Sequence, residues 1–273
     1  MRALSLEYHD VVDPGDFDGS GFQGAGPASY KLTAAVFAAH LQAIGYAVKT
    51  VPGLATEWLA GSADSRPLFL TFDDGGVGAY THIADALEDH GWRGHFFVTT
   101  GRLGSATFLR PSQIRHLQQR GHVIGTHSCS HPARLGACSR EQIFAEWQRS
   151  IQALEDIMGT AVVTGSVPGG FYTAAVGEAA ADAGLRVLFT SWPTSRCWTV
   201  RGCRIVGRYT LRRWSSPGTA AALAAGDATP RLSQWAWYRS LHLLRTVAGD
   251  RYTSLRQNFW AKRNPGVRSH ISG

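Results

Sequence analysis

The feature that most constrains the fold is a regular alternation of short apolar runs with longer amphipathic segments. The clearest apolar runs are residues 68–72, 94–99, 122–126 and 187–190. Each is bounded by Gly, Pro or polar residues, as is typical of buried strands, and the segments between them repeat apolar residues at helical spacing. Strands that alternate with helices pair in parallel within one sheet. The sequence therefore predicts an α/β fold whose parallel sheet is closed, or nearly closed, into a barrel.

The remaining segments extend this pattern in both directions. The N-terminal part predicts a strand over residues 3–8, a helix over 32–44 that ends at Gly45, and a strand over 46–51. Residues 13–29 are rich in Gly, Pro, Asp and Ser, and a loop of that length is often a lid or a substrate wall. Residues 231–264 predict one or two helices rich in Trp, Tyr and Arg. We expect a barrel over residues 1–215 and a helical extension over residues 216–273 packed on it.

Charge and composition limit the class of partner and the compartment. The net charge is +7, but the basic residues are dispersed and form no long run, so we expect no nucleic-acid partner. We expect the aromatic segment at residues 231–264 to pack on the barrel. The alternative is that it contacts a membrane surface. No signal peptide is visible before Glu7, and the four cysteines contain no CxxC pair. These patterns predict a cytoplasmic protein with free thiols.

Two adjacent carboxylates, Asp73 and Asp74, follow the strand predicted at residues 68–72. Like charges at a strand end repel unless a cation lies beside them. A divalent metal resolves this, because one carboxylate binds it while the other handles protons. The alternative is a turn whose Asp side chains cap backbone N–H groups.

A second motif, His127-Ser-Cys-Ser-His131-Pro132, follows the strand predicted at residues 122–126. Two His four residues apart on a short helical turn present both imidazoles on one face, which is a metal-ligand spacing. The alternative is two unrelated loop histidines, since the chain has eleven. The carboxyl ends of barrel strands meet at one end, where active sites lie. His9, Pro168 and Trp192 are predicted at the same end.

Together, Thr71-Phe72-Asp73-Asp74-Gly75 and the His127–His131 motif resemble the first two motifs of the polysaccharide deacetylase (NodB-homology, carbohydrate esterase 4) family. The resemblance covers residues 1–210 and implies a distorted (β/α) barrel of about seven strands. It implies that Asp74, His127 and His131 bind Zn²⁺ or another divalent metal, and that Asp73 is the general base. The metal-bound water then attacks an acetamide carbonyl.

The later motifs depart from the family pattern. Its third motif, Arg-x-Pro followed by an aromatic residue and Gly, appears as Ser166-Val167-Pro168, so the Arg that orients the base is missing. Its Asp-Trp motif appears as Ser191-Trp192, which loses the acid. The resemblance still implies substrate contacts from five residues, namely Pro168, Gly169, Gly170, Tyr172 and Trp192. Candidates to replace the missing Arg and Asp of these motifs are Asp10, Arg196, Arg204 and Arg208.

The expected general acid, a late His, has no match after residue 190 within the barrel. The stretch Tyr8-His9-Asp10 resembles a family branch that carries a Tyr-His motif on its first strand. We therefore expect His9 to be the general acid that protonates the leaving amine. The alternative is a core His hydrogen-bonded to Asp10.

The modified third motif resembles the N-acetylglucosaminyl deacetylases of glycopeptide antibiotic pathways, of the teicoplanin type. The expected activity is removal of the N-acetyl group from a sugar on a glycopeptide pseudoaglycone. The alternatives are deacetylation of a chitin-like or other polysaccharide, or a non-catalytic barrel that only binds sugar. An intact Asp73 argues against binding alone, since binding needs no free base beside the metal.

Overall fold

The computed structural model describes residues 1–61 and 66–248, with side chains described to residue 240. Within this part, nine strands form one curled sheet in the order β11-β1-β4-β5-β6-β7-β8-β10-β9. The strands are β1 (Leu4–Tyr8), β4 (Leu68–Phe72), β5 (His95–Val98), β6 (Val123–Thr126), β7 (Thr164–Ser166), β8 (Val187–Thr190), β9 (Trp198–Val200), β10 (Cys203–Gly207) and β11 (Tyr209–Thr210). All neighbours pair in parallel except β9, which is antiparallel to β10. The predicted α/β barrel class is confirmed.

The barrel is closed by one bent stretch of chain. β10 pairs with β8, and β11 pairs with β1 on the opposite edge of the sheet. Arg208 is the single residue between β10 and β11. The chain therefore passes at Arg208 from β10, next to the edge strand β9, to the opposite edge strand β11, which places this residue at the seam of the barrel.

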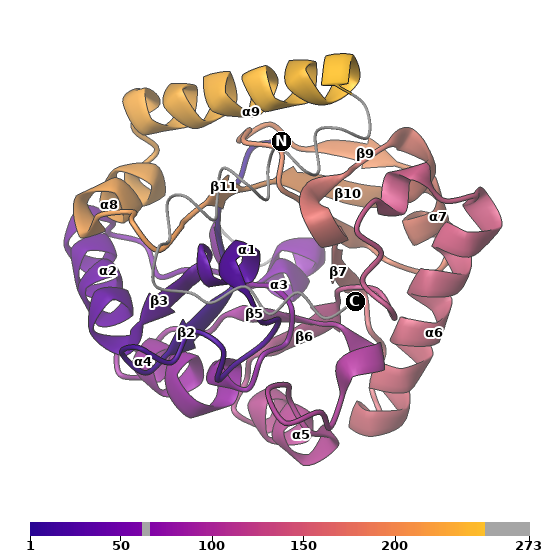
Figure 1. Cartoon of the computed structure of the whole chain (residues 1–273), viewed down its shortest axis with the longest axis horizontal. Coiled ribbons are helices and arrows are strands. Elements are labelled where there is room, and N and C mark those ends of the chain that lie inside the picture. Colours follow the sequence, from indigo (N-terminus) through magenta and orange to yellow (C-terminus); the bar gives the residue numbers. More distant parts are fainter. Residues whose placement is uncertain (62–65, 249–273) are drawn as a thin grey trace.

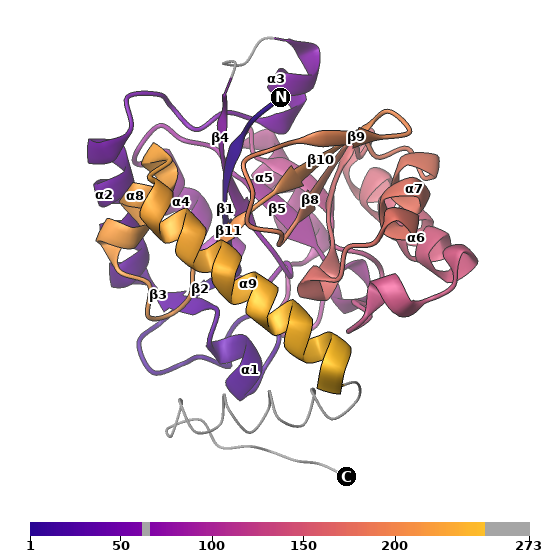
Figure 2. The ribbon, with the colours of Figure 1, turned by 90° about the horizontal axis from the view of Figure 1, so that it is seen from above.

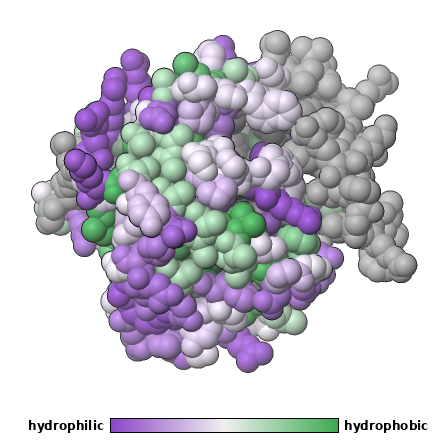
Figure 3. All heavy atoms as spheres, turned by 90° about the vertical axis from the view of Figure 1, so that its left-hand side faces the viewer, coloured by the Kyte–Doolittle hydropathy of each residue, from purple (hydrophilic) through white to green (hydrophobic). Residues whose placement is uncertain are grey.

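Helices surround the sheet (Figure 1). They are α1 (Ala25–Ala28), α2 (Ala34–Ala47), α3 (Ala55–Ala60), α4 (Ala84–Glu88), α5 (Pro111–Gln119), α6 (Arg140–Met158), α7 (Ala174–Asp182), α8 (Pro217–Ala225) and α9 (Ala228–Ala248), with a π-helical turn, η1 (Ala79–Ile83), before α4. α8 packs on α2 and β1, and α9 runs across the outside of the barrel (Figure 2). The side that carries α2 and α8 has a weakly hydrophobic centre bordered by hydrophilic groups (Figure 3), which matches their alanine-rich sequences.

Strand alternation separates two cores. Leu68, Leu70 and Phe72 of β4 belong to the larger core, which the sheet shares with the helices. Phe69 points the other way and joins a second core with Phe97 of β5, inside the barrel. α3 contributes to this inner core, which therefore fills one end of the barrel and leaves the carboxyl ends of the strands for polar side chains.

The structure differs from the prediction in the segment after α2 and in a second, small sheet. The strand predicted at residues 46–51 is wrong, because α2 continues to Ala47 and residues 48–54 are irregular. Gly45 does not end the helix, because it lacks the positive φ of a left-handed cap and lies within α2. A second, two-stranded sheet of β2 (Asp10–Val12) and β3 (Lys31–Thr33) was not predicted, and it brackets the loop at residues 13–29.

Residues 249–264 of the predicted tail lie outside the described residues, and the division into a barrel and an extension at residue 215 stays a prediction. Within the described residues, no helix is sufficiently long and apolar to cross a membrane.

Candidate active site

Asp73 and Asp74 lie where β4 ends, and the backbone separates their side chains. Asp73 is almost fully buried, while Asp74 adopts a left-handed conformation with φ of 74°. Ser128 and His131 also have positive φ, at 65° and 57°. Such conformations are costly for residues other than Gly and cluster at functional sites. Three of the four non-Gly residues with positive φ in the described chain therefore lie in the two predicted motifs.

Asp74, His127 and His131 place one ligand atom each within 4.8 Å of one another. Asp74 Oδ1 lies 3.5 Å from Nε2 of His127 and 3.6 Å from Nε2 of His131. Nδ1 of His127 lies 3.0 Å from the carbonyl oxygen of Ser166, so Nδ1 donates and the Nε2 lone pair remains for a metal. One carboxylate and two imidazoles suit a catalytic divalent metal with open positions. The residues present therefore fit the metal that the family implies.

Electrostatics within this group follow from burial and charge. Burial lowers the pKa of His131 to about 4, helped by the neighbouring His127, so His131 is neutral at pH 7. Burial also lowers the pKa of His127, but the carboxylates of Asp73 and Asp74 more than offset this and raise it. A neutral imidazole and an ionised carboxylate are the forms that bind metal.

The histidine pair lies on a bent loop and not on the helical turn that the sequence predicted. The left-handed Ser128 breaks any helix, and its Oγ accepts a hydrogen bond from the His131 N–H at 3.1 Å. Glu146 of α6 then accepts from both the N–H and the Oγ of Ser130, at 2.7 and 2.9 Å. The loop between the two imidazoles is thus fixed by a buried carboxylate that the sequence did not reveal.

Asp73 is held by Arg208, which is fully buried. The guanidinium donates to both carboxylate oxygens at 2.7 Å, a bidentate geometry. Burial raises the pKa of Asp73, but the Arg208 guanidinium and His127 overcome that effect and hold the pKa well below its usual range. Asp73 is therefore ionised and oriented, as a general base requires, with Oδ2 at 3.9 Å from Nε2 of His127.

Arg208 thus occupies the role of the missing motif Arg, although it comes from the seam between β10 and β11. The other replacements considered lie elsewhere. Arg204 stacks over Trp58 at 4.4 Å at the α3 end of the barrel. The backbone of Arg196 forms an isolated antiparallel β-bridge with that of Arg2. The Asp10 carboxylate accepts a hydrogen bond from the Val11 N–H at 2.9 Å.

A second buried carboxylate, that of Glu7, was not predicted from the sequence. Its Oε1 accepts from Arg208 at 2.8 Å and from the Ser191 hydroxyl at 2.7 Å, and its Oε2 accepts from Thr210. Ser191 stands where the family has an acid, so Glu7 reaches that place from β1. The available signal was strand alternation, which puts Glu7 on the same face as His9, inside the barrel.

Glu7, His9 and Asp73 also form a group with metal-ligand spacing. Arg208 already binds both carboxylates of this group, so a second cation there would face a buried positive charge. Of the two groups, that of Asp74 therefore fits a metal better.

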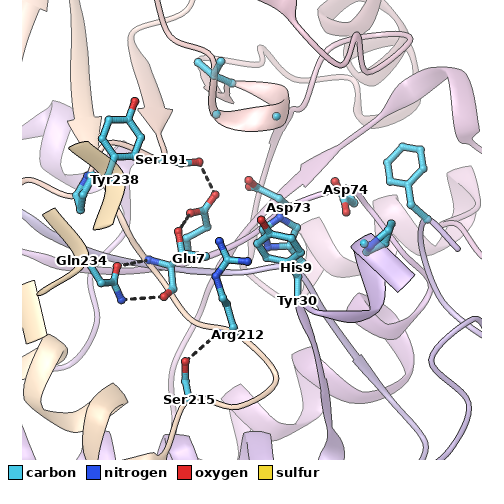
Figure 4. Close-up of a pocket in the computed structure, with 18 of the residues that line it drawn as sticks. Glu7, His9, Tyr30, Asp73, Asp74, Ser191, Arg212, Ser215, Gln234 and Tyr238 are labelled. Carbon is cyan, nitrogen blue, oxygen red and sulfur yellow. Dashed lines mark hydrogen bonds between the residues drawn. The ribbon is translucent and has the colours of Figure 1, made fainter. Parts of the chain in front are cut away.

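His9 follows β1, and its ring lies against Tyr30 with centroids 4.4 Å apart. It lines the same pocket as Asp73 and Asp74 (Figure 4). Among the described residues no hydrogen bond joins His9 to Asp10, and its buried Nδ1 has no partner. His9 is thus placed beside the candidate base, and its role as acid stays a prediction.

The pocket has a volume of about 660 Å³. Gly169 and Gly170 line it, whereas Pro168, Tyr172 and Trp192 are not among its lining residues. The rings of Tyr172 and Trp192 instead pack on Trp198, each at 5.7 Å.

The wall opposite the metal ligands comes from Tyr30, the segment after β11 and α9, whereas Phe22 of the N-terminal loop lies against His131. Tyr30, Arg212 and Tyr238 extend into it (Figure 4), with Arg212 over the Tyr30 ring at 4.3 Å. Trp214 and Trp237 belong to the same wall and are 49% and 46% exposed, and Arg212 lies over the Trp214 ring at 5.8 Å.

A barrel with one Asp and two His at its strand ends, beside an Arg-held carboxylate, defines a candidate metal-dependent hydrolase site. The polysaccharide deacetylase family model matches residues 60–188. The chitooligosaccharide deacetylase of Rhizobium leguminosarum bv. trifolii is 30% identical over 173 residues, which is 63% of this chain and 70% of that protein. The chain belongs to the polysaccharide deacetylase family.

Other relatives match part of the chain. The peptidoglycan-N-acetylglucosamine deacetylase PgdA of Listeria monocytogenes is 29% identical over 148 residues, covering 54% of this chain but only 30% of that protein. Two solved structures share the fold. Streptococcus pyogenes deacetylase PplD in complex with acetate has a TM-score of 0.64 and 20% identity over 80% of this chain and 95% of that one. IcaB from Ammonifex degensii has a TM-score of 0.65 and 22% identity, covering 82% and 97%.

Proposed function

We propose that the protein is a metal-dependent deacetylase that removes the N-acetyl group from an N-acetylglucosaminyl unit. The observation that carries this proposal is the Asp74, His127 and His131 group beside the Arg208-held Asp73, all at one end of the barrel. Binding alone requires no ionised carboxylate held beside the metal ligands, so the arrangement favours catalysis over a sugar-binding barrel.

In this proposal each residue has one task. Asp74, His127 and His131 would hold a divalent metal, Zn²⁺ or a similar ion, which would serve as a Lewis acid for the acetamide carbonyl and lower the pKa of a water. Asp73 accepts a proton from the attacking water, and Arg208 keeps its oxygens directed. His9 donates a proton to the leaving sugar amine as the C–N bond breaks, which leaves acetate and a free amine. A backbone N–H after Pro168, such as that of Gly169, would donate to the developing oxyanion.

For the acceptor, we propose a sugar carried on a glycopeptide antibiotic scaffold. The pocket volume of about 660 Å³ is in the range that holds a drug-sized ligand, and its wall opposite the metal ligands is aromatic. Trp237 lines this wall and is 46% exposed, so aromatic side chains of such a scaffold can stack on it. The alternative is a polysaccharide, as the names of the chitooligosaccharide and peptidoglycan deacetylases indicate for those relatives.

The test is acetate release from an N-acetylglucosaminyl glycopeptide and from a chitin oligomer, before and after chelation and with Zn²⁺ restored. We expect metal-dependent release from the glycopeptide, and a much larger loss with Trp237→Ala for the glycopeptide than for the oligomer. Release from the oligomer alone would replace the glycopeptide by a polysaccharide. No release from either, with metal bound, would favour the binding-only alternative.

The His9 assignment is tested in the same assay. His9→Ala should lower the rate by about 100-fold or more, because general acid catalysis contributes that much. A fully active His9→Ala would place the acid elsewhere. A cytoplasmic location is also proposed, and fractionation of producing cells would test it.

A further inference from the structure

Lys31 lies at the start of β3 and is only 2% exposed. Its ammonium donates to three backbone carbonyls of the preceding loop, those of Phe17, Ser20 and Phe22, at 2.6, 2.6 and 2.5 Å. An ammonium group has three N–H donors, so this set satisfies Lys31 completely. We call these contacts the Lys31 cage.

The Lys31 cage is anchored to the barrel on its other side. Lys31 pairs in register with Asp10, which directly follows His9 and is the first residue of β2. Burial lowers the pKa of Lys31, and the carboxylates of Asp10 and Asp18 oppose that shift only in part. Asp18 also accepts from the Gly24 N–H at 2.8 Å, which closes the loop on itself. Residues 17–24 are therefore held from within by charge-assisted hydrogen bonds.

The loop delivers Phe22 to the candidate metal site. The Phe22 ring lies 4.7 Å from the ring of His131 and 5.1 Å from that of Phe108. Arg102 lies over the same ring at 5.5 Å. Phe22 lines the pocket, so it covers one side of His131 and forms part of the wall that a substrate meets.

We propose that Lys31 is a positioning residue that holds residues 17–24 as a fixed wall of the pocket, so that Phe22 covers the metal ligand His131. The loop is then a preformed surface and not a lid that opens for each substrate. The inference that residues 17–24 are fixed rests on the hydrogen bonds of the Lys31 cage alone. The effect of this wall on metal exchange and substrate binding rests on the proposed function.

The first experiment is limited proteolysis with chymotrypsin, which cleaves after Phe17 and Phe22. Native protein should resist cleavage there under conditions that cut unfolded protein. Lys31→Met keeps a side chain of similar length but leaves the three carbonyls of the Lys31 cage without a donor. It should raise the cleavage rate by roughly 100-fold. Lys49→Met makes the same change at an exposed lysine and should have no effect. Rapid cleavage of the native protein would overturn the fixed wall without bearing on the metal or the chemistry.

The second experiment measures metal release to a chromogenic chelator. Phe22→Ala leaves the Lys31 cage in place, since the Phe22 carbonyl remains, but it uncovers His131. We expect release to accelerate roughly 3- to 10-fold, the value of one aromatic contact. Phe22→Leu keeps apolar cover and should have a smaller effect. Equal release rates for wild type and Phe22→Ala would refute the covering role, and this result stands whether or not Lys31→Met folds.

Turnover then separates positioning from general loss of structure. With the substrate that wild type deacetylates, Phe22→Ala and Lys31→Met should raise KM more than they lower kcat, because the wall is altered while Asp73 and Arg208 are intact. A fall in kcat at unchanged KM would contradict the proposal. If wild type releases no acetate, the proposed function fails while the proteolysis and metal-release results still decide the fixed wall.

Discussion

The bond between Arg208 and Asp73 makes the strongest energetic prediction. The Arg208 guanidinium lies between two buried carboxylates, with N···O distances of 2.7 Å to both oxygens of Asp73 and 2.8 Å to Glu7. Arg208→Met retains an apolar stem but removes the charge, so both carboxylates are left buried without a cation. Breaking a buried ion pair by removing one partner costs about 3–5 kcal/mol. We expect the free energy of unfolding at pH 7 to fall by that amount.

The measurement is urea denaturation of wild type and Arg208→Met, with Arg115→Met as a control at an exposed arginine of α5. The double variant Arg208→Met/Glu7→Gln should regain part of the loss, because it removes one uncompensated carboxylate. Without the guanidinium, burial raises the pKa of Asp73 in the folded state, so the deficit should shrink as pH falls toward 4. A loss below about 1 kcal/mol, the size of an exposed ion pair, would refute the reasoning.

Three further predictions test the fold. Burial lowers the pKa of His95 to about 4, so the unfolded chain binds its proton first and stability falls as pH drops from about 6.5 to 4, by about 3 kcal/mol. His95→Gln should remove that part of the pH dependence in urea titrations, and an unchanged dependence would contradict the assignment. Gly76→Ala would place a Cβ 1.9 Å from Asp10 Oδ2 and should lower the melting temperature, whereas Gly26→Ala, with no atom within 4 Å, should leave it equal or higher; similar effects of the two would be inconsistent with the packing. Ser139→Ala removes the cap of α6 and should cost about 1 kcal/mol in the same denaturation assay, and no loss would show that the cap is dispensable.

The sequence predicted the parts of the site that local rules govern. Asp73, Asp74, His127 and His131 follow predicted parallel strands, and the carboxyl ends of such strands must meet at one end of a barrel. The spacing of the two histidines correctly predicted that they lie close together. The helical turn predicted between them was wrong, because the left-handed conformation of Ser128 has no signature in the sequence.

Glu7 and Arg208 were beyond local rules. Their contact spans 201 positions of the chain, and that of Arg208 with Asp73 spans 135. Both contacts depend on the bend at Arg208, between β10 and β11. A one-residue bend between two short strands has no sequence signature. The sequence therefore did not distinguish Arg196, Arg204 and Arg208 as the replacement for the missing Arg, and the structure pairs Arg208 with Asp73. The strand predicted at residues 46–51 failed for a related reason, since alternation indicates a strand only where a neighbouring strand can pair with it.

The central claim is that Asp74 binds the metal while Asp73 is the base. It is tested most directly by measuring bound divalent metal and acetate release in wild type, Asp73→Asn and Asp74→Asn. We predict that Asp73→Asn keeps its metal and loses turnover, whereas Asp74→Asn loses both. Full metal content in Asp74→Asn, or normal turnover in Asp73→Asn, would contradict the account.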